Sequence, residues 1–200
     1  MFSDIVIPKN NELEFIEIAS KLGLKKIYFL YDFDKHMQSQ KSKIFDFDVE
    51  IGFAINQKNM NTALQQSKLL VAKSSDKDRF FIESKKIKLI YGFEEIYRKD
   101  YIHQRASGLN HVICELANKN NVAIGFSYSL LFNKDEYHKS VLMGRMMQNI
   151  KLCHKYKVKT IIGSFSENPF EMRAPYDIAS LFKLLGMGGR NVNDSLTTEL

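Results

Sequence analysis

Arg105 and two neighbouring residues have the types and positions expected of an anion-binding site. Arg105 lies just upstream of a predicted helix whose first turn would hold Asn110 and His111. A cation near a helix N-terminus is unfavourable unless an anion lies between them, because the free backbone amides there are already positive. A bound phosphate would satisfy the amides and the guanidinium together. The alternatives are that Arg105 pairs with a nearby carboxylate and that His111 is a half-exposed helix residue.

A second polar group follows the spacing of a helix predicted over residues 136–156. Four polar side chains share an arc of roughly 120° on that helix, opposite its apolar face: Arg145, Gln148, Lys151 and Lys155. Cations along one face could follow a run of phosphates. An ordinary solvated helix face would give the same pattern.

The third group is the loop 164–177, which follows a predicted strand and precedes a helix beginning at Pro175. Connections of this length usually carry a function beyond joining elements. Arg173 again lies beside a helix start, where it could share an anion with the backbone amides. The competing interpretation is an ion pair between Arg173 and Glu171.

Hydrolytic chemistry would need a nucleophile beside a base, converging carboxylates or a metal cluster. Asp4, Asp32 and Asp34 lie near the ends of early strands and are candidate metal ligands, but no HxH or HExxH motif accompanies them. Cys114 and Cys153 fall in apolar helical patterns without CxxC spacing, so we expect both in the core. We therefore expect no catalytic residue and no metal ligand in this chain.

The elements that would position these residues are short apolar strands alternating with helices. The expected strands are 3–7, 26–31, 47–55, 69–72, 88–91, 122–126 and 160–163; the expected helices are 11–22, 59–67, 108–117, 136–156 and 175–186. This alternation predicts successive β–α units, which form either a closed barrel or an open doubly wound sheet. No GxGxxG or GxxxxGK[ST] loop is present, and this favours a compact, irregular TIM-barrel-like (β/α) barrel. We expect one barrel domain over 1–187 and a flexible tail over 188–200.

Helical periodicity also predicts which residues are buried. Leu13, Ile16 and Ala19 should face inward on the first helix, and Ser107 should cap the helix that follows it. On the two clearest helices the predicted buried faces are Leu109, Val112, Ile113, Leu116 and Ala117, and then Leu142, Met146, Ile150 and Cys153.

Composition restricts the class of protein. Hydrophobic residues make up 44% and charged residues 26% of the 200 residues, which excludes disordered, collagen-like and coiled-coil chains. No apolar run approaches the roughly 18 residues of a membrane span, and the N-terminus lacks the pattern of a secretory signal, so we expect a cytoplasmic protein. The net charge is +6, with the larger excess in the second half, where an anionic partner is expected.

Five segments in the second half resemble one known family. They are 105–112 (RASGLNHV), 124–131 (IGFSYSLL), 145–153 (RMMQNIKLC), 171–177 (EMRAPYD) and 185–187 (LGM). In this order they resemble the ribonuclease P protein component 3 family of archaea and eukaryotes. The resemblance implies a barrel related to the polymerase-and-histidinol-phosphatase fold.

The resemblance also implies a role in ribonuclease P, the endoribonuclease that removes 5′ leaders from precursor tRNA. In that assembly the RNA subunit is the catalyst and uses Mg²⁺, and the protein binds no cofactor. The implied partners are the catalytic domain of the ribonuclease P RNA, protein component 2 in a 2:2 heterotetramer, and precursor tRNA indirectly, without a membrane.

The residues that match the family's polar signature are then RNA-binding candidates: Arg105, Asn110, His111, Arg145, Lys151 and Arg173. The sequence departs from the family at Ala174 and Tyr176, where Ser and Arg are expected. Two alternatives remain: a free-standing metal-dependent phosphoesterase of the related superfamily, and a barrel that binds only proteins.

Overall fold

Seven parallel strands in sequence order form the centre of the protein. The computed structural model describes residues 1–33, 46–97, 99–132, 134–197 and 199–200. The strands are β1 (Ser3–Val6), β2 (Lys26–Asp32), β3 (Asp48–Ile55), β4 (Leu70–Lys73), β5 (Leu89–Tyr91), β6 (Ala123–Ser127) and β7 (Thr160–Gly163). Because parallel neighbours need a long crossover, helices connect most of them.

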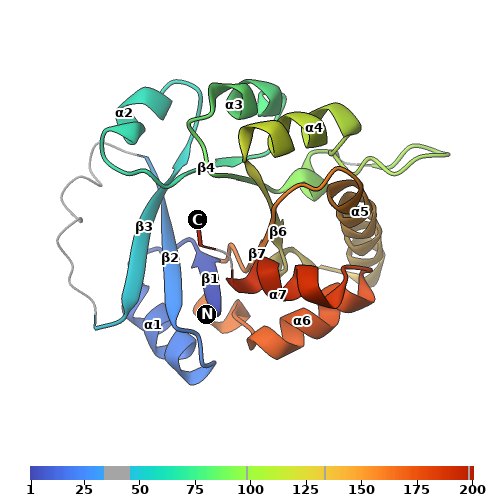
Figure 1. Cartoon of the computed structure of the whole chain (residues 1–200). Helices are drawn as coiled ribbons and strands as arrows, with labels where there is room; N and C mark the ends of the chain where they lie inside the picture. Colours follow the sequence, from blue (N-terminus) through green and yellow to red (C-terminus); the bar gives the residue numbers. More distant parts are fainter. Residues whose placement is uncertain (34–45, 98, 133, 198) are drawn as a thin grey trace.

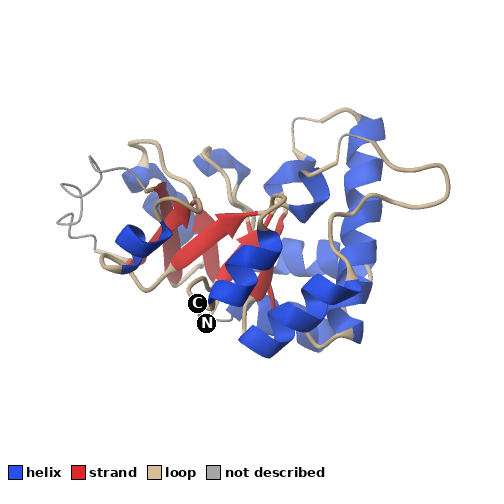
Figure 2. Cartoon of the chain, turned by 90° about the horizontal axis from the view of Figure 1, so that it is seen from above, coloured by secondary structure: helices blue, strands red, loops and turns tan. Residues whose placement is uncertain are grey.

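The helices surround the strands on the outside (Figures 1 and 2). They are α1 (Glu12–Lys21), α2 (Met60–Leu64), α3 (Asp78–Ser84), α4 (His111–Asn120), α5 (Glu136–Lys155), α6 (Pro175–Leu184) and α7 (Gly189–Thr197). Short 3₁₀ turns follow three strands: η2 (Phe93–Glu95), η3 (Ser129–Leu131) and η4 (Pro169–Glu171). None of the helices in these ranges is long and apolar enough to cross a membrane.

Backbone contacts between β1 and the chain after β7 close the barrel. The Phe165 amide donates to the Ile5 carbonyl at 2.7 Å, and the Ile7 amide donates to the Ser166 carbonyl at 2.8 Å. Val6 and Ser166 form an isolated parallel bridge. This seam excludes the open doubly wound sheet and confirms the predicted TIM-barrel-like fold.

Two apolar clusters lie on opposite faces of the strands. One contains strand residues and no residue of the surrounding helices, including Tyr28, Leu30 and Val71, and therefore fills the barrel interior. Tyr91 and Phe165 stack there with ring centroids 4.3 Å apart. The other cluster joins the alternate strand residues to the helices. Since apolar side chains fill the interior, any functional group must come from the loops and helix ends.

The prediction of the buried face of α1 was wrong at Leu13 and was confirmed at Ala19. Leu13 is 75% exposed, whereas Glu12, Phe15 and Ala19 are buried. The helix is rotated so that Glu12 faces inward, because the Tyr31 hydroxyl donates a hydrogen bond of 3.1 Å to its carboxylate. On α5, by contrast, the predicted buried residues Leu142, Met146, Ile150 and Cys153 are confirmed.

The start of α4 also differs from the prediction. Gly108 has a φ of 82°, which a right-handed helix does not allow, and the helix begins at His111. Its cap is Asn110 rather than Ser107, with Asn110 Oδ1 accepting from the Ile113 amide at 3.0 Å. Val112, expected in the core, is 41% exposed.

The flexible tail expected over 188–200 is replaced by a packed helix over most of its length. Helix α7 buries Val192, Ser195 and Leu196. Its Ser195 hydroxyl lies 2.6 Å from Thr160 Oγ1 on β7. Gly188 and Gly189 suggested a flexible tail. However, Val192 and Leu196 lie four residues apart, so they share one side of a helix, and this side packs against the barrel.

Candidate nucleic-acid interface

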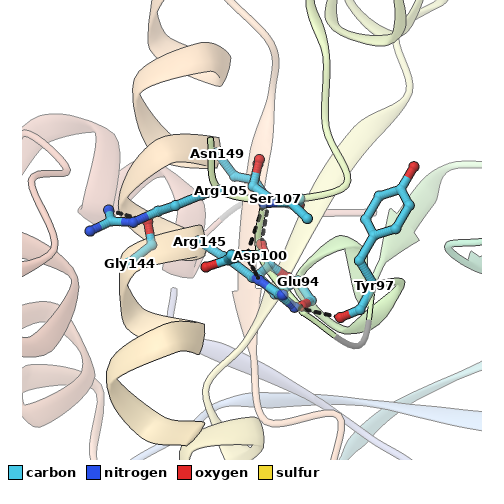
Figure 3. Close-up of polar contacts among 9 residues, drawn as sticks. Glu94, Tyr97, Asp100, Arg105, Ser107, Gly144, Arg145 and Asn149 are labelled. Atoms are coloured by element: carbon cyan, nitrogen blue, oxygen red, sulfur yellow. Dashed lines mark hydrogen bonds and ion pairs between the residues drawn. The ribbon is translucent and has the colours of Figure 1, made fainter. Parts of the chain in front are cut away.

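Arg145 lies at the centre of a buried network between α5 and the segment 94–107 (Figure 3). Its side chain is 3% exposed, and its Nε donates to Asp100 Oδ1 at 2.8 Å. Its Nη1 donates to the carbonyls of Glu94 and Tyr97, both at 2.7 Å. The expectation that Arg145 belongs to a solvated helix face was therefore wrong, because the segment before α4 covers this part of α5.

Asn149, one turn further along α5, connects the two ends of the same segment. Its Nδ2 donates to Glu94 Oε1 at 2.8 Å and to the Ser107 carbonyl at 2.9 Å. Burial raises the pKa of Glu94 to about 7. Within the part of the chain that the structure describes, four buried atoms of this network have no hydrogen-bond partner: Glu94 Oε2, Ser107 Oγ, Arg145 Nη2 and Asn149 Oδ1.

Arg105 remains exposed but lies against α5. Its Nη1 donates to the Gly144 carbonyl at 3.0 Å, and a Cβ at Gly144 would come within 2.8 Å of its Cζ. The neighbouring Ala106 amide donates to Asp100 Oδ1 at 2.9 Å. Asp100 therefore fixes both the buried Arg145 and the backbone beside Arg105.

Arg173 occupies a different loop, between β7 and α6. Its Nη1 donates to the carbonyls of Phe170 and Met172, both at 2.8 Å. Its guanidinium lies 4.4 Å from the centroid of the Phe132 ring, a cation–π contact. Arg173 is exposed, so part of its guanidinium remains available to an anion.

The exposed residues among the RNA-binding candidates lie at two different ends of the barrel. The loops that carry Arg105 and Arg173 follow β5 and β7, and Asn110 and His111 begin α4, so all four lie at the carboxyl end of the strands. These four residues are exposed. Lys151 is also exposed, but it lies in the second half of α5, toward the opposite end of the barrel.

Of the early carboxylates considered as metal ligands, the structure describes Asp4 and Asp32. Asp4 is buried, with Oδ1 accepting from the amides of Ile5 and Ser164 and Oδ2 accepting from the Tyr128 hydroxyl. Burial raises its pKa to about 6. Asp32 is exposed, and Asp34 lies outside the described residues. No group of three or more His, Cys, Asp or Glu in the described ranges could hold a metal ion.

Sequence reasoning missed Glu94, Asp100 and Asn149. Asn149 lies four residues after Arg145, which places both on one side of a helix, and this spacing was an available signal. The two carboxylates belong to a segment without helical or strand periodicity, so no local pattern connected them to α5. Cys114 and Cys153 are both buried, as predicted.

The closed barrel and the cation-bearing loops at its carboxyl end define a TIM-barrel-like protein. The family model described as RNase P subunit p30 matches residues 96–200, slightly more than half of the chain. The chain therefore belongs to this family.

Individual relatives agree with this assignment. The chain is 33% identical over 91 residues to ribonuclease P protein component 3 of Methanocaldococcus jannaschii, covering 46% of this chain and 37% of that protein. It is 34% identical over 110 residues to the component 3 protein of Thermococcus gammatolerans, covering 55% of this chain and 48% of that protein. The matched segments thus span less than half the length of these relatives.

A solved structure supports the fold over nearly the whole chain. A chain in the cryo-EM structure of archaeal ribonuclease P with mature tRNA matches with a TM-score of 0.74 and 20% identity. The match covers 96% of this chain and 87% of that chain. At this identity the likeness shows a shared fold, including the first half, where the family model does not match.

Proposed function

We propose that this protein is a subunit of a ribonuclease P that supports RNA-catalysed removal of 5′ leaders from precursor tRNA. The observation that carries the proposal is the family match over residues 96–200. That range holds all six residues predicted to bind RNA. It also holds the loops that present Arg105 and Arg173 at the carboxyl end of the strands.

The catalyst in this proposal is the RNA, which also holds the Mg²⁺, and this chain supplies no catalytic residue. Asp4 is buried and uses both oxygens to join parts of its own barrel, which supports a structural role. The proposed partners are the catalytic domain of the ribonuclease P RNA, protein component 2 in a 2:2 heterotetramer, and precursor tRNA indirectly. The proposed compartment is the cytoplasm.

Within this proposal the exposed residues contact RNA. Arg105 and Arg173 have guanidinium groups that can pair with phosphate oxygens in two-pronged geometry. His111 and Lys151 are exposed and add further positive or hydrogen-bonding groups. Asn110 can offer its amide nitrogen while its oxygen caps α4. Arg145 acts through the segment it holds, because its side chain cannot reach a phosphate outside the protein without leaving Asp100.

Reconstitution tests the proposal directly. The ribonuclease P RNA is assembled with its other protein subunits, and precursor tRNA cleavage is measured against Mg²⁺ concentration with and without this chain. We expect the chain to lower the Mg²⁺ concentration needed for half-maximal cleavage. An unchanged Mg²⁺ dependence would contradict the proposal. Turnover of a generic phosphodiester by the purified chain, abolished by a chelator, would instead support a phosphoesterase.

A further inference from the structure

The segment 97–105 exposes an unusual amount of apolar surface. Tyr97 is 45% exposed, Tyr101 is 65% exposed and Ile102 is 94% exposed. Figure 1 shows residues 99–105, in yellow-green, extending away from the barrel beside α5. The rings of Tyr97 and Tyr101 lie near each other, with centroids 6.5 Å apart. Exposed aromatic groups gathered at one place are typical of a binding surface rather than of a connection between elements.

Hydrogen bonds attach the base of this segment to α5. The buried Arg145 holds the Tyr97 carbonyl and the Asp100 carboxylate, and Asp100 also accepts from the Ala106 amide. At the tip, the Tyr101 amide donates to the Gln104 carbonyl at 2.9 Å. Because these contacts already order the backbone, binding through the tip carries a smaller entropic cost.

The charges around the aromatic rings favour a polyanion. Lys99, His103 and Arg105 are exposed. Asp100 is an acid of the same segment, but it is engaged by Arg145 at 2.8 Å. Flat aromatic faces interleaved with cations are the chemistry that binds unpaired nucleotides, since bases stack on the rings and phosphates pair with the cations.

We propose that the tip of the 97–105 segment binds unpaired nucleotides of an RNA. Tyr101 and Tyr97 stack on bases, and Lys99 and Arg105 face the phosphates. The inference rests on the proposed function and deepens it by naming single-stranded RNA as the form that this surface recognises. The alternative partner of the tip is an apolar surface of a protein, because Ile102 is also apolar and exposed. The experiment must distinguish RNA from protein as the partner.

A fluorescent reporter tests the proposal, because the chain contains no tryptophan. Tyr101→Trp places a single indole at the tip, and Leu184→Trp places one at an equally exposed position at the far end of α6. On titration with a single-stranded oligonucleotide, stacking should quench Trp emission in the first variant and leave the second unchanged. An RNA duplex of the same length should quench much less. Equal emission changes in both variants, or none, would overturn the proposal.

Affinity measurements with the full chain give a second, independent readout. Tyr101→Leu keeps apolar area but removes the ring, and we expect it to weaken binding to single-stranded RNA at least about fivefold, whereas Tyr101→Phe should retain wild-type affinity. Leu184→Ala, at an exposed apolar residue of α6 outside the tip, should leave the RNA affinity unchanged. If Tyr101→Leu binds single-stranded RNA as tightly as the wild type, the tip is not an RNA site.

The same experiments separate the two proposals. Wild-type protein that lowers the Mg²⁺ requirement while the tip variants behave like wild type would overturn only the role of the tip. Wild-type protein that neither binds RNA nor changes cleavage would overturn the proposed function as well. Far-UV circular dichroism of each variant confirms folding, which we expect to be unaffected because the substituted side chains are exposed.

Discussion

The Tyr128 hydroxyl donates a hydrogen bond of 2.9 Å to Asp4 Oδ2, which joins β1 to the chain immediately after β6. The same hydroxyl accepts from the Arg173 amide at 3.3 Å. One phenol therefore connects the carboxylate at the barrel seam to the loop that carries an RNA-binding candidate.

Tyr128→Phe should therefore destabilise the barrel. The substitution leaves a buried carboxylate oxygen without this donor, and such a loss costs about 1–3 kcal/mol. Chemical denaturation should show the decrease in the free energy of unfolding. Tyr137→Phe, at a tyrosine that is 71% exposed, is the matched control and should change nothing. Equal stability of the two variants would contradict the importance of the Tyr128–Asp4 contact.

Stability should depend on pH through Glu94. Burial raises the pKa of this carboxyl from an ordinary value of 4.5 to about 7. Between those pH values the folded state binds more protons than the unfolded state, so the contribution of Glu94 to the free energy of unfolding falls as pH rises.

Glu94→Gln isolates this effect, because glutamine keeps an oxygen acceptor for Asn149 but cannot ionise. Relative to wild type, the variant should gain stability steadily from about pH 4.5 to about pH 7, by up to about 3 kcal/mol. Denaturant unfolding at a series of pH values measures the difference, and the raised pKa of Asp4 cancels because both proteins share it. A difference that does not change with pH would mean that Glu94 ionises normally.

Gly144→Ala should separate stability from RNA binding. Alanine is favoured over glycine within a helix by about 0.5–1 kcal/mol. The new Cβ would also approach Arg105 Cζ to 2.8 Å, so the flexible guanidinium must move. We expect an unchanged or higher melting temperature together with weaker RNA affinity, similar to that of Arg105→Ala. A lower melting temperature would show instead that Arg105 cannot be displaced.

Two of the cations on α5, Arg145 and Lys151, should respond differently to substitution. Arg145→Met removes the donor to the carbonyls of Glu94 and Tyr97 and the cation paired with Asp100, so we expect a loss of about 3 kcal/mol in the free energy of unfolding. Lys151→Met changes an exposed side chain and should stay within about 0.5 kcal/mol of wild type. Denaturation of both variants checks this, and similar values for the two would refute the structural role of Arg145.

The salt dependence of RNA binding should identify phosphate contacts. If Arg105 and Arg173 each neutralise one phosphate, each alanine variant should reduce the log–log slope of affinity against salt by about one. The measurement is RNA affinity at several salt concentrations, with melting temperatures recorded on the same samples. Unchanged slopes combined with lower melting temperatures would mean that these arginines serve only their contacts with backbone carbonyls.

Most strands could be predicted because they are buried on both faces and therefore appear as short apolar runs, whereas β3 is only partly buried along its first half. β7, for example, is predicted and observed over the same residues, Thr160–Gly163. The buried face of α5 followed from periodicity in the same way. Both features are local, so the sequence around them contains the information that determines them.

The burial of Arg145 could not be predicted, because it depends on a segment some 45 residues away in the chain folding over α5. Periodicity describes the faces of one helix and does not say which of them another segment covers. The rotation of α1 was missed for a related reason, since the buried Glu12 accepts a hydrogen bond from Tyr31, which lies 19 residues away in the chain. Side chains whose environment comes from distant segments are the ones for which sequence reasoning fails.

The seam of the barrel has a consequence for how the chain folds. Successive strands pair with their neighbours in sequence, but the Ser164 amide reaches the Asp4 carboxylate across 160 residues. Closing so long a loop is entropically expensive and slow, so this seam forms after the local pairings. During synthesis β1 leaves the ribosome first, yet one of its edges stays unpaired until residues 164–166 emerge. For that interval an open strand edge is available to other chains, which makes the nascent protein most prone to aggregate before residues 164–166 are made.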